Sequence, residues 1–308
     1  MCNSSNGRIP TGKTRTCSSL NGHEIQSPAT FRTSVRERTF HGPTNGICPG
    51  YIQCNLVVLK AKDAFDFLLF CQRNTQACPL IEVLDVGSYS PLQSCKGLGP
   101  DAADLRTDIP MYRIFKHGKL VEETSDVTQH WPEDSVAFLI GCSFTVDGAL
   151  LDAGIRLRAA EEKKNVPMFK TNIPCTRAGN LSGNLVVSMK PIKALDITKE
   201  IEITSKFPHA HGAPICVGCP ASIGISDVMK PDFGDAVDIK DDELPVFHAC
   251  GVTAQNIILA SQPEFAITHS PGYMLVTDLP AEKPPMWSWI DFQSLYLLVR
   301  GPNFQRYY

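Results

Sequence analysis

Apolar residues in this chain form short unbroken runs that stop at small residues and then resume at helical spacing. The most distinct run, residues 136–140, is too short for a helix and contains no polar residue, as expected of a strand buried on both faces. Apolar positions after Phe144 follow helical spacing, and Gly154 is placed to end the helix in a left-handed cap. The pattern predicts a strand, a tight turn that carries Cys142 and Ser143, and a helix.

Residues 245–260 repeat this pattern, with an apolar run, the pair Cys250–Gly251, Thr253 as an N-cap, and a helical run. In open α/β sheets, ligands bind at the carboxyl ends of strands. We therefore expect Cys142 and Cys250 at one edge of a single sheet, as candidate catalytic residues. The alternative is that both are small buried thiols that fill space at strand ends, since free cysteine is among the most buried residue types.

The rest of the chain alternates strand and helix patterns. We expect strands at residues 50–60, 80–86 and 184–189, helices at 64–73 and 195–206, and hairpins at 114–123 and 266–278. Residues 161–175 contain two X-Pro steps and are expected to form an extended loop. Together these elements predict an α/β fold, in which helices flank a mixed sheet and a second, smaller α+β lobe is attached.

Changes in composition along the sequence divide the chain into three segments. Residues 1–27 are rich in Ser, Thr and Asn with a few basic residues, which suits a disordered tail or a mitochondrial transit segment. Residues 28–280 are expected to form the folded domain, with two lobes that are discontinuous in sequence. Residues 281–308 lack a clear period and are expected to be an irregular tail.

The composition limits the kinds of binding partner and the cellular compartment that we expect for this chain. The net charge is −3, 43% of the 308 residues are hydrophobic, and no Lys/Arg cluster stands out, so we expect no nucleic-acid partner. The apolar runs are shorter than a membrane span, so we expect no membrane partner. Twelve cysteines in a core-rich chain favour a reducing compartment, the mitochondrial matrix or the cytoplasm. We expect a small-molecule substrate and no cofactor, and a homo-oligomer is left open.

Polar residues outside the two cysteine turns supply candidate binding groups. Arg106 and Arg113 could each grip a carboxylate through paired N–H donors. The alternative is that Asp104 and Asp108 hold these arginines in local ion pairs. Thr171 and Asn172 offer a hydroxyl and an amide, or else cap a neighbouring element.

Several histidines are candidates for acid–base catalysis or for metal binding. His269, at a strand end beside a Pro-Gly turn, is the candidate acid/base, although a half-buried histidine with satisfied hydrogen bonds is the commoner outcome. A zinc site can be written from four residues, His209, His211, Cys216 and Cys219. A single CxxC in a cysteine-rich chain is a weak signal, so we predict no metal site.

Seven segments appear in an order that resembles the hydro-lyase family, which includes the N-terminal half of animal mitochondrial D-glutamate cyclase. They are residues 49–57 (PGYIQCNLV), 104–110 (DLRTDIP), 138–144 (FLIGCSF), 165–175 (NVPMFKTNIPC), 211–214 (HGAP), 249–253 (ACGVT) and 267–272 (ITHSPG). The resemblance implies a two-lobed α/β fold and dehydration of D-glutamate to 5-oxo-D-proline, or loss of water from a related small acid.

That chemistry assigns provisional roles to the candidates. A cationic clamp, an acid/base and donors to a developing oxyanion are needed. Arg106 and Arg113 would form the clamp and His269 the acid/base, while Thr171, Asn172 and the turn with Ser143 orient the substrate. Two alternatives remain: a small-acid-binding module that acts with a partner domain, and a thiol-redox protein that uses Cys216 and Cys219.

Overall fold

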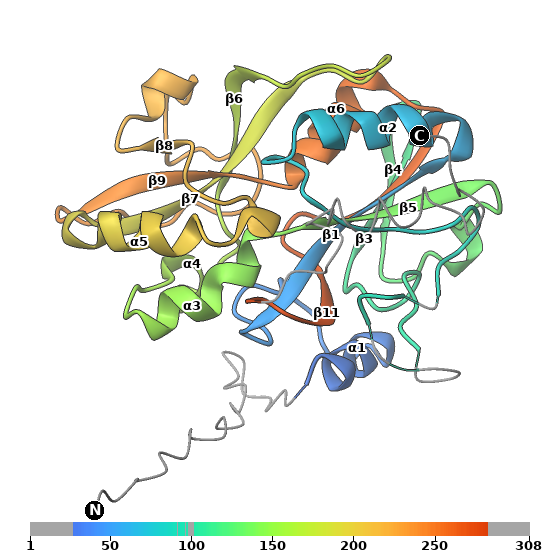
Figure 1. Cartoon of the computed structure of the whole chain (residues 1–308), viewed down its shortest axis with the longest axis horizontal. Coiled ribbons are helices and arrows are strands. Elements are labelled where there is room, and N and C mark those ends of the chain that lie inside the picture. Colours follow the sequence, from blue (N-terminus) through green and yellow to red (C-terminus); the bar gives the residue numbers. More distant parts are fainter. Residues whose placement is uncertain (1–26, 91, 96, 98–101, 283–308) are drawn as a thin grey trace, which may run out of the picture.

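The computed structural model describes residues 27–90, 92–95, 97 and 102–282, and it contains two β-sheets with helices packed around them (Figure 1). The predicted α/β class with two sheet-based lobes is confirmed. All strand pairings among the described residues are antiparallel, so the βα units that the sequence suggested are not joined as parallel neighbours.

The larger sheet has seven strands in the order β2-β5-β1-β10-β3-β4, with β11 also paired to β1. The strands are β1 Tyr51–Lys60, β2 Leu80–Val83, β3 Tyr112–Lys116, β4 Lys119–Thr124, β5 Ser135–Gly141, β10 Phe265–His269 and β11 Leu275–Pro280. Strand β1 is central because it pairs with β5 along one edge and with β10 and β11 along the other. All its residues between the two ends are buried.

The smaller sheet has four strands in the order β6-β7-β9-β8, all from the middle of the chain. Their bounds are β6 Met168–Pro174, β7 Asn184–Lys193, β8 Cys216–Val217 and β9 Glu243–Ala249. Because the larger sheet takes its strands from both sides of this segment, the described chain leaves the larger sheet, builds the smaller one and returns.

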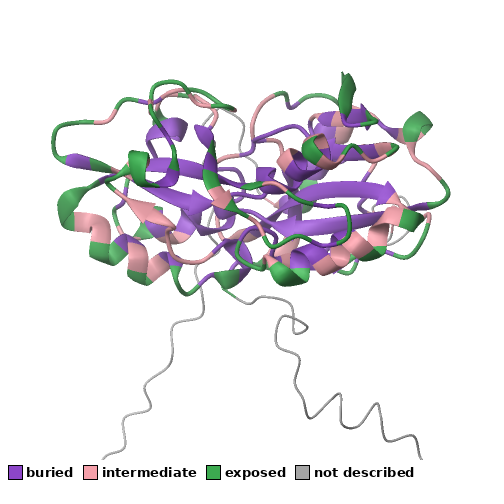
Figure 2. Ribbon diagram, turned by 90° about the horizontal axis from the view of Figure 1, so that it is seen from above, coloured by how far each residue is buried: buried purple, intermediate pink, exposed green. Residues whose placement is uncertain are grey.

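Helices pack against both sheets, and most of the strands are buried (Figure 2). The helices are α1 Pro28–Arg36, α2 Ala61–Arg73, α3 Asp147–Asp152, α4 Arg158–Glu161, α5 Ile197–Thr204 and α6 Val252–Ser261. Helices α2 and α6 share one core with β1, β5, β7 and β9, so this core joins the two lobes. A second core lies on the opposite face of the larger sheet and is closed by the loop that follows β2. None of the helices described is long and apolar enough to cross a membrane.

Several predicted elements are confirmed. Strand β1, helices α2, α5 and α6, and the β3–β4 hairpin lie where the pattern indicated. Both turn residues of the hairpin, His117 and Gly118, have positive φ, at 49° and 72°. Gly154 has a φ of 80°, the left-handed conformation expected of a helix-ending glycine.

Other expectations were wrong. Residues 168–174 form strand β6 despite the two prolines, because β6 is an edge strand, where the missing N–H donors can be tolerated. Strands β10 and β11 do not pair with each other; both lie along the same edge of β1, end to end. The turn at Ser270–Gly272 therefore changes the direction of the chain without closing a hairpin.

The domain boundaries remain predictions. Residues 1–26 and 283–308, which include the expected transit segment and most of the expected tail, lie outside the described part of the chain.

Two phenylalanines of α2 provide a test of the core that joins the lobes. Phe67 is fully buried and its ring meets that of Phe138 edge-on, with 4.9 Å between centroids, whereas Phe65 is 71% exposed. We expect Phe67→Ala to lower the free energy of unfolding by about 3–5 kcal/mol. Phe65→Ala, the matched control, should change it by less than about 0.5 kcal/mol. Chemical denaturation measures both, and equal effects would contradict this account of the core.

Candidate active site

The end of β5 is held against a turn of the smaller lobe. The Gly141 N–H donates to the carbonyl oxygen of Pro79 at 2.8 Å. A Cβ at position 141 would overlap the carbonyl oxygen of His209, so no residue with a side chain fits without a shift of the backbone. Glycine here brings the backbone of β5 into direct contact with the turn that carries His209 and His211.

His211 is buried beside this contact and has a defined tautomer. It follows the 3-10 turn Pro208–Ala210 and has a φ of 76°, an uncommon conformation for a residue other than glycine. Its Nδ1 lies 2.8 Å from the carbonyl oxygen of Gln76, which can only accept, so Nδ1 carries the hydrogen. Nε2 then presents a lone pair, and it has no hydrogen-bond partner among the described residues.

Burial lowers the pKa of His211 to about 4, against a weaker opposing effect of the Gln76 carbonyl. The backbone of Gly141 also favours the protonated ring, although Nε2 makes no hydrogen bond with it in this geometry. The ring is therefore neutral at pH 7, and its Nε2 keeps a lone pair that can accept a proton. These are the properties of a buried base.

His209 and His248 complete a group of three histidines. Nε2 of His209 donates to the carbonyl oxygen of Ala281 at 2.9 Å, its Nδ1 has no partner among the described residues, and burial lowers its pKa. His248, on β9, has Nε2 2.7 Å from Oε1 of Glu200 and Nδ1 3.3 Å from the carbonyl oxygen of Gly212. Glu200 is fully buried in α5, and its Oε2 has no hydrogen-bond partner among the described residues. We call Glu200, His209, His211 and His248 the histidine site.

A groove of about 1180 Å³ adjoins the histidine site and has room for a small organic acid. His209 and His211 form part of its lining, next to residues of α2, β2 and the segment after α5. Among the groove residues with polar or charged side chains are Gln72, Gln76, Glu82, Lys206 and Glu282. A bound molecule would thus lie beside two neutral imidazoles.

No sequence pattern singled out Glu200 or His248, and the spacing of His209 and His211 marked them only as candidate metal ligands. A signal for His248 was present, because it is the one titratable residue in the apolar run that forms the end of β9. Nothing in α5 marked Glu200 apart from its neighbouring acids. Only the fold brings residues 200 and 248 together.

Cys142 and Cys250 end strands of different sheets, β5 and β9, and so do not share the edge of one sheet as expected. They nevertheless lie close enough for Cys250 to raise the pKa of the Cys142 thiol. Burial raises the pKa of both thiols, that of Cys250 to about 12. The neighbouring Ser143 is also buried, at the start of the 3-10 turn Ser143–Val146. Thiols that remain protonated fit the space-filling alternative better than the role of nucleophile.

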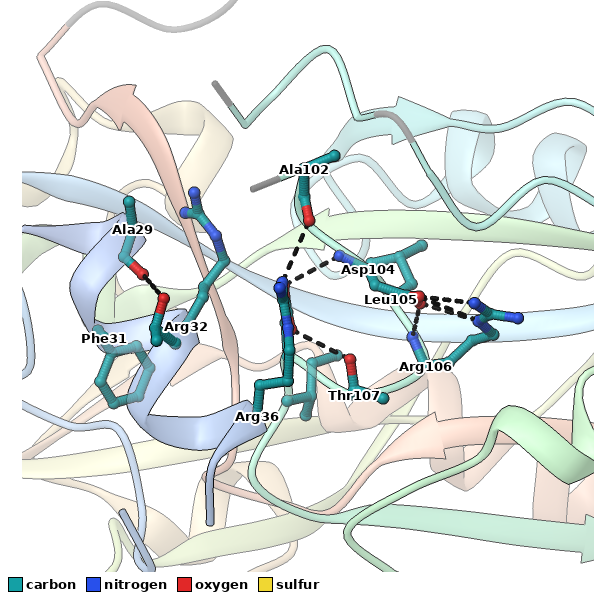
Figure 3. Close-up of polar contacts among 12 residues, drawn as sticks. Ala29, Phe31, Arg32, Arg36, Ala102, Asp104, Leu105, Arg106 and Thr107 are labelled. Carbon is teal, nitrogen blue, oxygen red and sulfur yellow. Dashed lines mark hydrogen bonds and ion pairs between the residues drawn. The ribbon is translucent and has the colours of Figure 1, made fainter. Parts of the chain in front are cut away.

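The two candidate arginines are held in local ion pairs. Nη2 of Arg106 lies 2.7 Å from Oδ2 of Asp104, and the guanidinium carbon of Arg106 is 3.3 Å from the centroid of the Tyr89 ring. Figure 3 shows Arg106 and Arg36 on opposite sides of the loop that contains Asp104. Arg113, on β3, lies 2.7 Å from Glu123 on β4. Asp104 thus pairs with Arg106 as the alternative expected, whereas Asp108 pairs with Arg36 and not with Arg113. No contact described joins either candidate arginine to the histidine site.

His269 lies on the other face of the larger sheet. In the pairing of β10 with β3, His269 lies directly opposite Tyr112, so the two side chains share one face of the sheet. The Tyr112 side chain belongs to the second core. Its Nδ1 accepts from the N–H of Leu56 at 3.1 Å, and burial lowers its pKa to about 4. In the neutral ring Nε2 therefore carries the hydrogen, and this N–H has no partner among the described residues, in the core rather than in the groove.

Thr171 and Asn172 lie on the edge strand β6. The Thr171 hydroxyl donates to the carbonyl oxygen of Leu185 at 2.8 Å, and Asn172 is exposed beside Gly224. No hydrogen bond described links either residue to the histidine site.

The alternative zinc ligands are separated. The Cys216 thiol lies 3.2 Å from the carbonyl oxygen of Cys219 and 3.6 Å from the Ser222 hydroxyl, while His209 and His211 bind other backbone carbonyls. Within the described ranges, no group of three or more His, Cys, Asp or Glu side chains is arranged to hold a metal ion.

The chain is thus an α/β protein in which two sheets are joined. It has the features of an enzyme, because a buried group of acid–base residues lies beside a groove. The sequence profile of the family described as D-glutamate cyclase matches residues 136–278. Bacterial relatives named "Putative hydro-lyase" are about 50% identical over most of the chain, so the chain belongs to their family. The resemblance noted in the sequence is thereby confirmed.

Three relatives illustrate the similarity. A "Putative hydro-lyase" of Stutzerimonas stutzeri is 48% identical over 86% of this chain and 98% of its own length. "Putative hydro-lyase YcsI" of Bacillus subtilis is 51% identical over 83% and 98%, and a "Putative hydro-lyase" of Agrobacterium fabrum is 51% identical over 85% and 95%. These relatives are bacterial and lend no support to a mitochondrial compartment. A solved structure, a nitrogen repressor-like protein from Methanococcus jannaschii, aligns with 84% of this chain and 100% of its own, at 9% identity and a TM-score of only 0.37.

The buried histidines predict how stability depends on pH. His211 and His269 each have a folded-state pKa of about 4 against an ordinary value of 6.5, so the unfolded state binds more protons between these pH values. Stability is therefore fully present above pH 6.5 and is lost as the pH falls towards 4, by up to about 3 kcal/mol per histidine.

Urea denaturation at several pH values measures this loss. His211→Asn should make the slope between pH 6.5 and 4 shallower than in the wild type, whatever its effect on stability at pH 7. An unchanged slope would show that His211 does not resist protonation in the folded state.

Proposed function

We propose that this chain is a hydro-lyase that binds a small carboxylic acid in the groove beside the histidine site. D-Glutamate is the proposed substrate and 5-oxo-D-proline the product. The family supports the hydro-lyase class. The observation that carries the proposal is the lone pair on Nε2 of His211, a neutral, buried base at the wall of a groove of suitable size.

The reaction closes a ring and releases water. A bond forms between the amino nitrogen and the γ-carboxyl carbon, and a C–O bond of that carboxylate breaks. The ammonium group loses two protons in total, and both end in the water that leaves. The reaction thus needs a base to free the amine before attack and an acid to protonate the departing oxygen.

Neutral imidazoles suit both proton transfers. Nε2 of His211 would take a proton from the ammonium group and become a donor, with its second N–H still bound to the Gln76 carbonyl. His248 lies behind the groove with an acceptor at each ring nitrogen, Oε1 of Glu200 and the carbonyl oxygen of Gly212. Because Nε2 of His211 is buried, local movement of the groove wall must accompany substrate binding.

A cation is also needed for the substrate carboxylate. Lys206 lies in the groove and is exposed, which makes it the simplest choice. Arg106 and Arg113, the clamp proposed from the sequence, would first have to leave Asp104 and Glu123.

The test of function uses purified protein with D- and L-glutamate, followed by chiral chromatography for 5-oxoproline. We expect product from the D-isomer only, and a loss of at least about 100-fold in kcat for His211→Asn, since general acid–base catalysis contributes roughly 10²–10⁴-fold. His117→Asn is the matched control. It changes an exposed histidine that also has positive φ, a conformation that asparagine tolerates.

No product from either isomer would refute the proposed reaction. If D-glutamate then still raised the melting temperature, the protein would be the small-acid-binding module that the sequence left open.

Steady-state kinetics distinguishes the two residues proposed to bind the substrate carboxylate, Lys206 and Arg106. We expect Lys206→Ala to raise KM for D-glutamate about 10-fold, because a charge-assisted contact to the carboxylate contributes about 1.5–3 kcal/mol. Arg106→Ala should leave KM within about twofold, since its charge is already neutralised by Asp104. The reverse result would restore Arg106 as the clamp and place the substrate near Tyr89.

A further inference from the structure

Three consecutive residues of the turn that carries His211 are held by groups from elsewhere in the chain. Nδ1 of His211 donates to the carbonyl oxygen of Gln76 at 2.8 Å. The carbonyl oxygen of Gly212 lies 3.3 Å from Nδ1 of His248, and that of Ala213 accepts from Nε2 of Gln76 at 2.9 Å. Gln76 lies between α2 and β2, whereas His248 lies on β9, so both lobes hold this turn.

His211 depends on these contacts because its backbone conformation is uncommon. The φ angles of His211 and Gly212 are 76° and 65°, so two consecutive residues are in the left-handed region. Glycine enters this region without a steric penalty, but a residue with a side chain does so at a cost in free energy. Such a conformation persists only where the surrounding structure enforces it. Loss of the contact at Gly212 should therefore let the turn relax and carry the His211 ring away from Gln76.

His248 is suited to hold the Gly212 carbonyl because its ring is fixed from the other side. Its Nε2 lies 2.7 Å from Oε1 of Glu200, and the two side chains are 4% and 0% exposed. The Gly212 carbonyl can only accept a hydrogen bond, so Nδ1 of His248 carries a hydrogen, whichever of Nε2 and Glu200 holds the proton between them. Both ring nitrogens of His248 are thus bonded, whereas His209 and His211 each keep one nitrogen unpaired among the described residues. His248 therefore lacks the free lone pair that a base needs.

We propose that His248 is a positioning residue, which holds the Gly212 carbonyl and so keeps the ring of His211 in place for catalysis. The inference rests on the proposed role of His211 as the base. Of the side chains that the structure describes, no other donates to the Gly212 carbonyl. Glu200 contributes by fixing the ring of His248, which accounts for a fully buried carboxyl group in α5.

Two substitutions of His248 separate its hydrogen bond from the rest of the side chain. His248→Leu removes the donor, whereas His248→Asn places an amide nitrogen near the position of Nδ1 and so can keep the bond. Gln255→Leu is the matched control, because Gln255 is 1% exposed and also donates to a backbone carbonyl, that of His269 at 2.7 Å, outside the turn. If His248→Leu does not fold because Glu200 is left unpaired, the double variant with Glu200→Leu replaces both partners by apolar groups.

Steady-state kinetics with D-glutamate is the first measurement. We expect His248→Leu, or the double variant, to lower kcat roughly 10- to 100-fold with KM within about threefold, because misplacement of a base affects the chemical step. His248→Asn should recover kcat to within about fivefold of the wild type, and Gln255→Leu should keep it within about threefold. Equal losses for His248→Leu and His248→Asn, or an equal loss in the control, would overturn the proposal.

Hydrogen–deuterium exchange gives a second readout that does not depend on activity. We expect the amides of residues 209–215 to exchange faster in His248→Leu than in the wild type and to stay unchanged in Gln255→Leu. If the wild type lacks activity on D-glutamate but this difference is seen, the proposed reaction fails while the positioning role of His248 stands. If the exchange of this segment is the same in both variants, the positioning role is refuted.

The wild type alone provides a third check. ¹⁵N spectra of its imidazole nitrogens at neutral pH should show a hydrogen on Nδ1 of His248, as the bond to the Gly212 carbonyl requires. An Nδ1 without a hydrogen would contradict the proposal without any substitution.

Discussion

The contact between Gly141 and the carbonyl oxygen of His209 is the constraint on which the rest of the site depends. It joins the last residue of a fully buried strand of one sheet to a turn that packs on the other. A methyl group at position 141 would push the turn away, and with it His211, whose ring is held from the opposite side by Gln76. The two lobes therefore meet backbone to backbone, and the histidines are buried because the glycine permits this approach.

Burial then determines the chemistry of the histidines. Desolvation penalises the charged ring, so His209 and His211 stay neutral at pH 7 and each keeps a lone pair on one nitrogen. A structural histidine in a core would pair both nitrogens, since an unpaired acceptor costs roughly 1–3 kcal/mol. Two unpaired acceptors of this kind, Nδ1 of His209 and Nε2 of His211, occur among the buried histidines that the structure describes. Both belong to residues that line the groove, which is the arrangement expected of a site that accepts protons from a ligand.

The local fold could be predicted from the sequence, whereas the site could not. Residues 136–154 and the His117–Gly118 turn carry their structure in short-range patterns, and both formed as expected. The partner of His248 is 48 residues away on a helix, and the partner of Gly141 is 68 residues away on a turn. Neither spacing follows from periodicity, because each depends on how the two sheets pack. The β10 and β11 pairings failed for the same reason, since a Pro-Gly turn suits a hairpin and a simple bend equally well.

The cysteine turns remain the most conspicuous feature of the sequence, and the structure suggests why cysteine occupies them. The backbone N–H two residues later, of Phe144 or Val252, acts to lower the pKa of each thiol. That contact alone would favour a thiolate, but burial outweighs it, and with a pKa of about 12 on the order of one Cys250 in 10⁵ is ionised at pH 7. Serine would bring a strongly polar hydroxyl into the same core. A protonated thiol is a small apolar group that suits this buried position, so these residues fill space around Gly141 and Gly251, while proton transfer is assigned to the histidines.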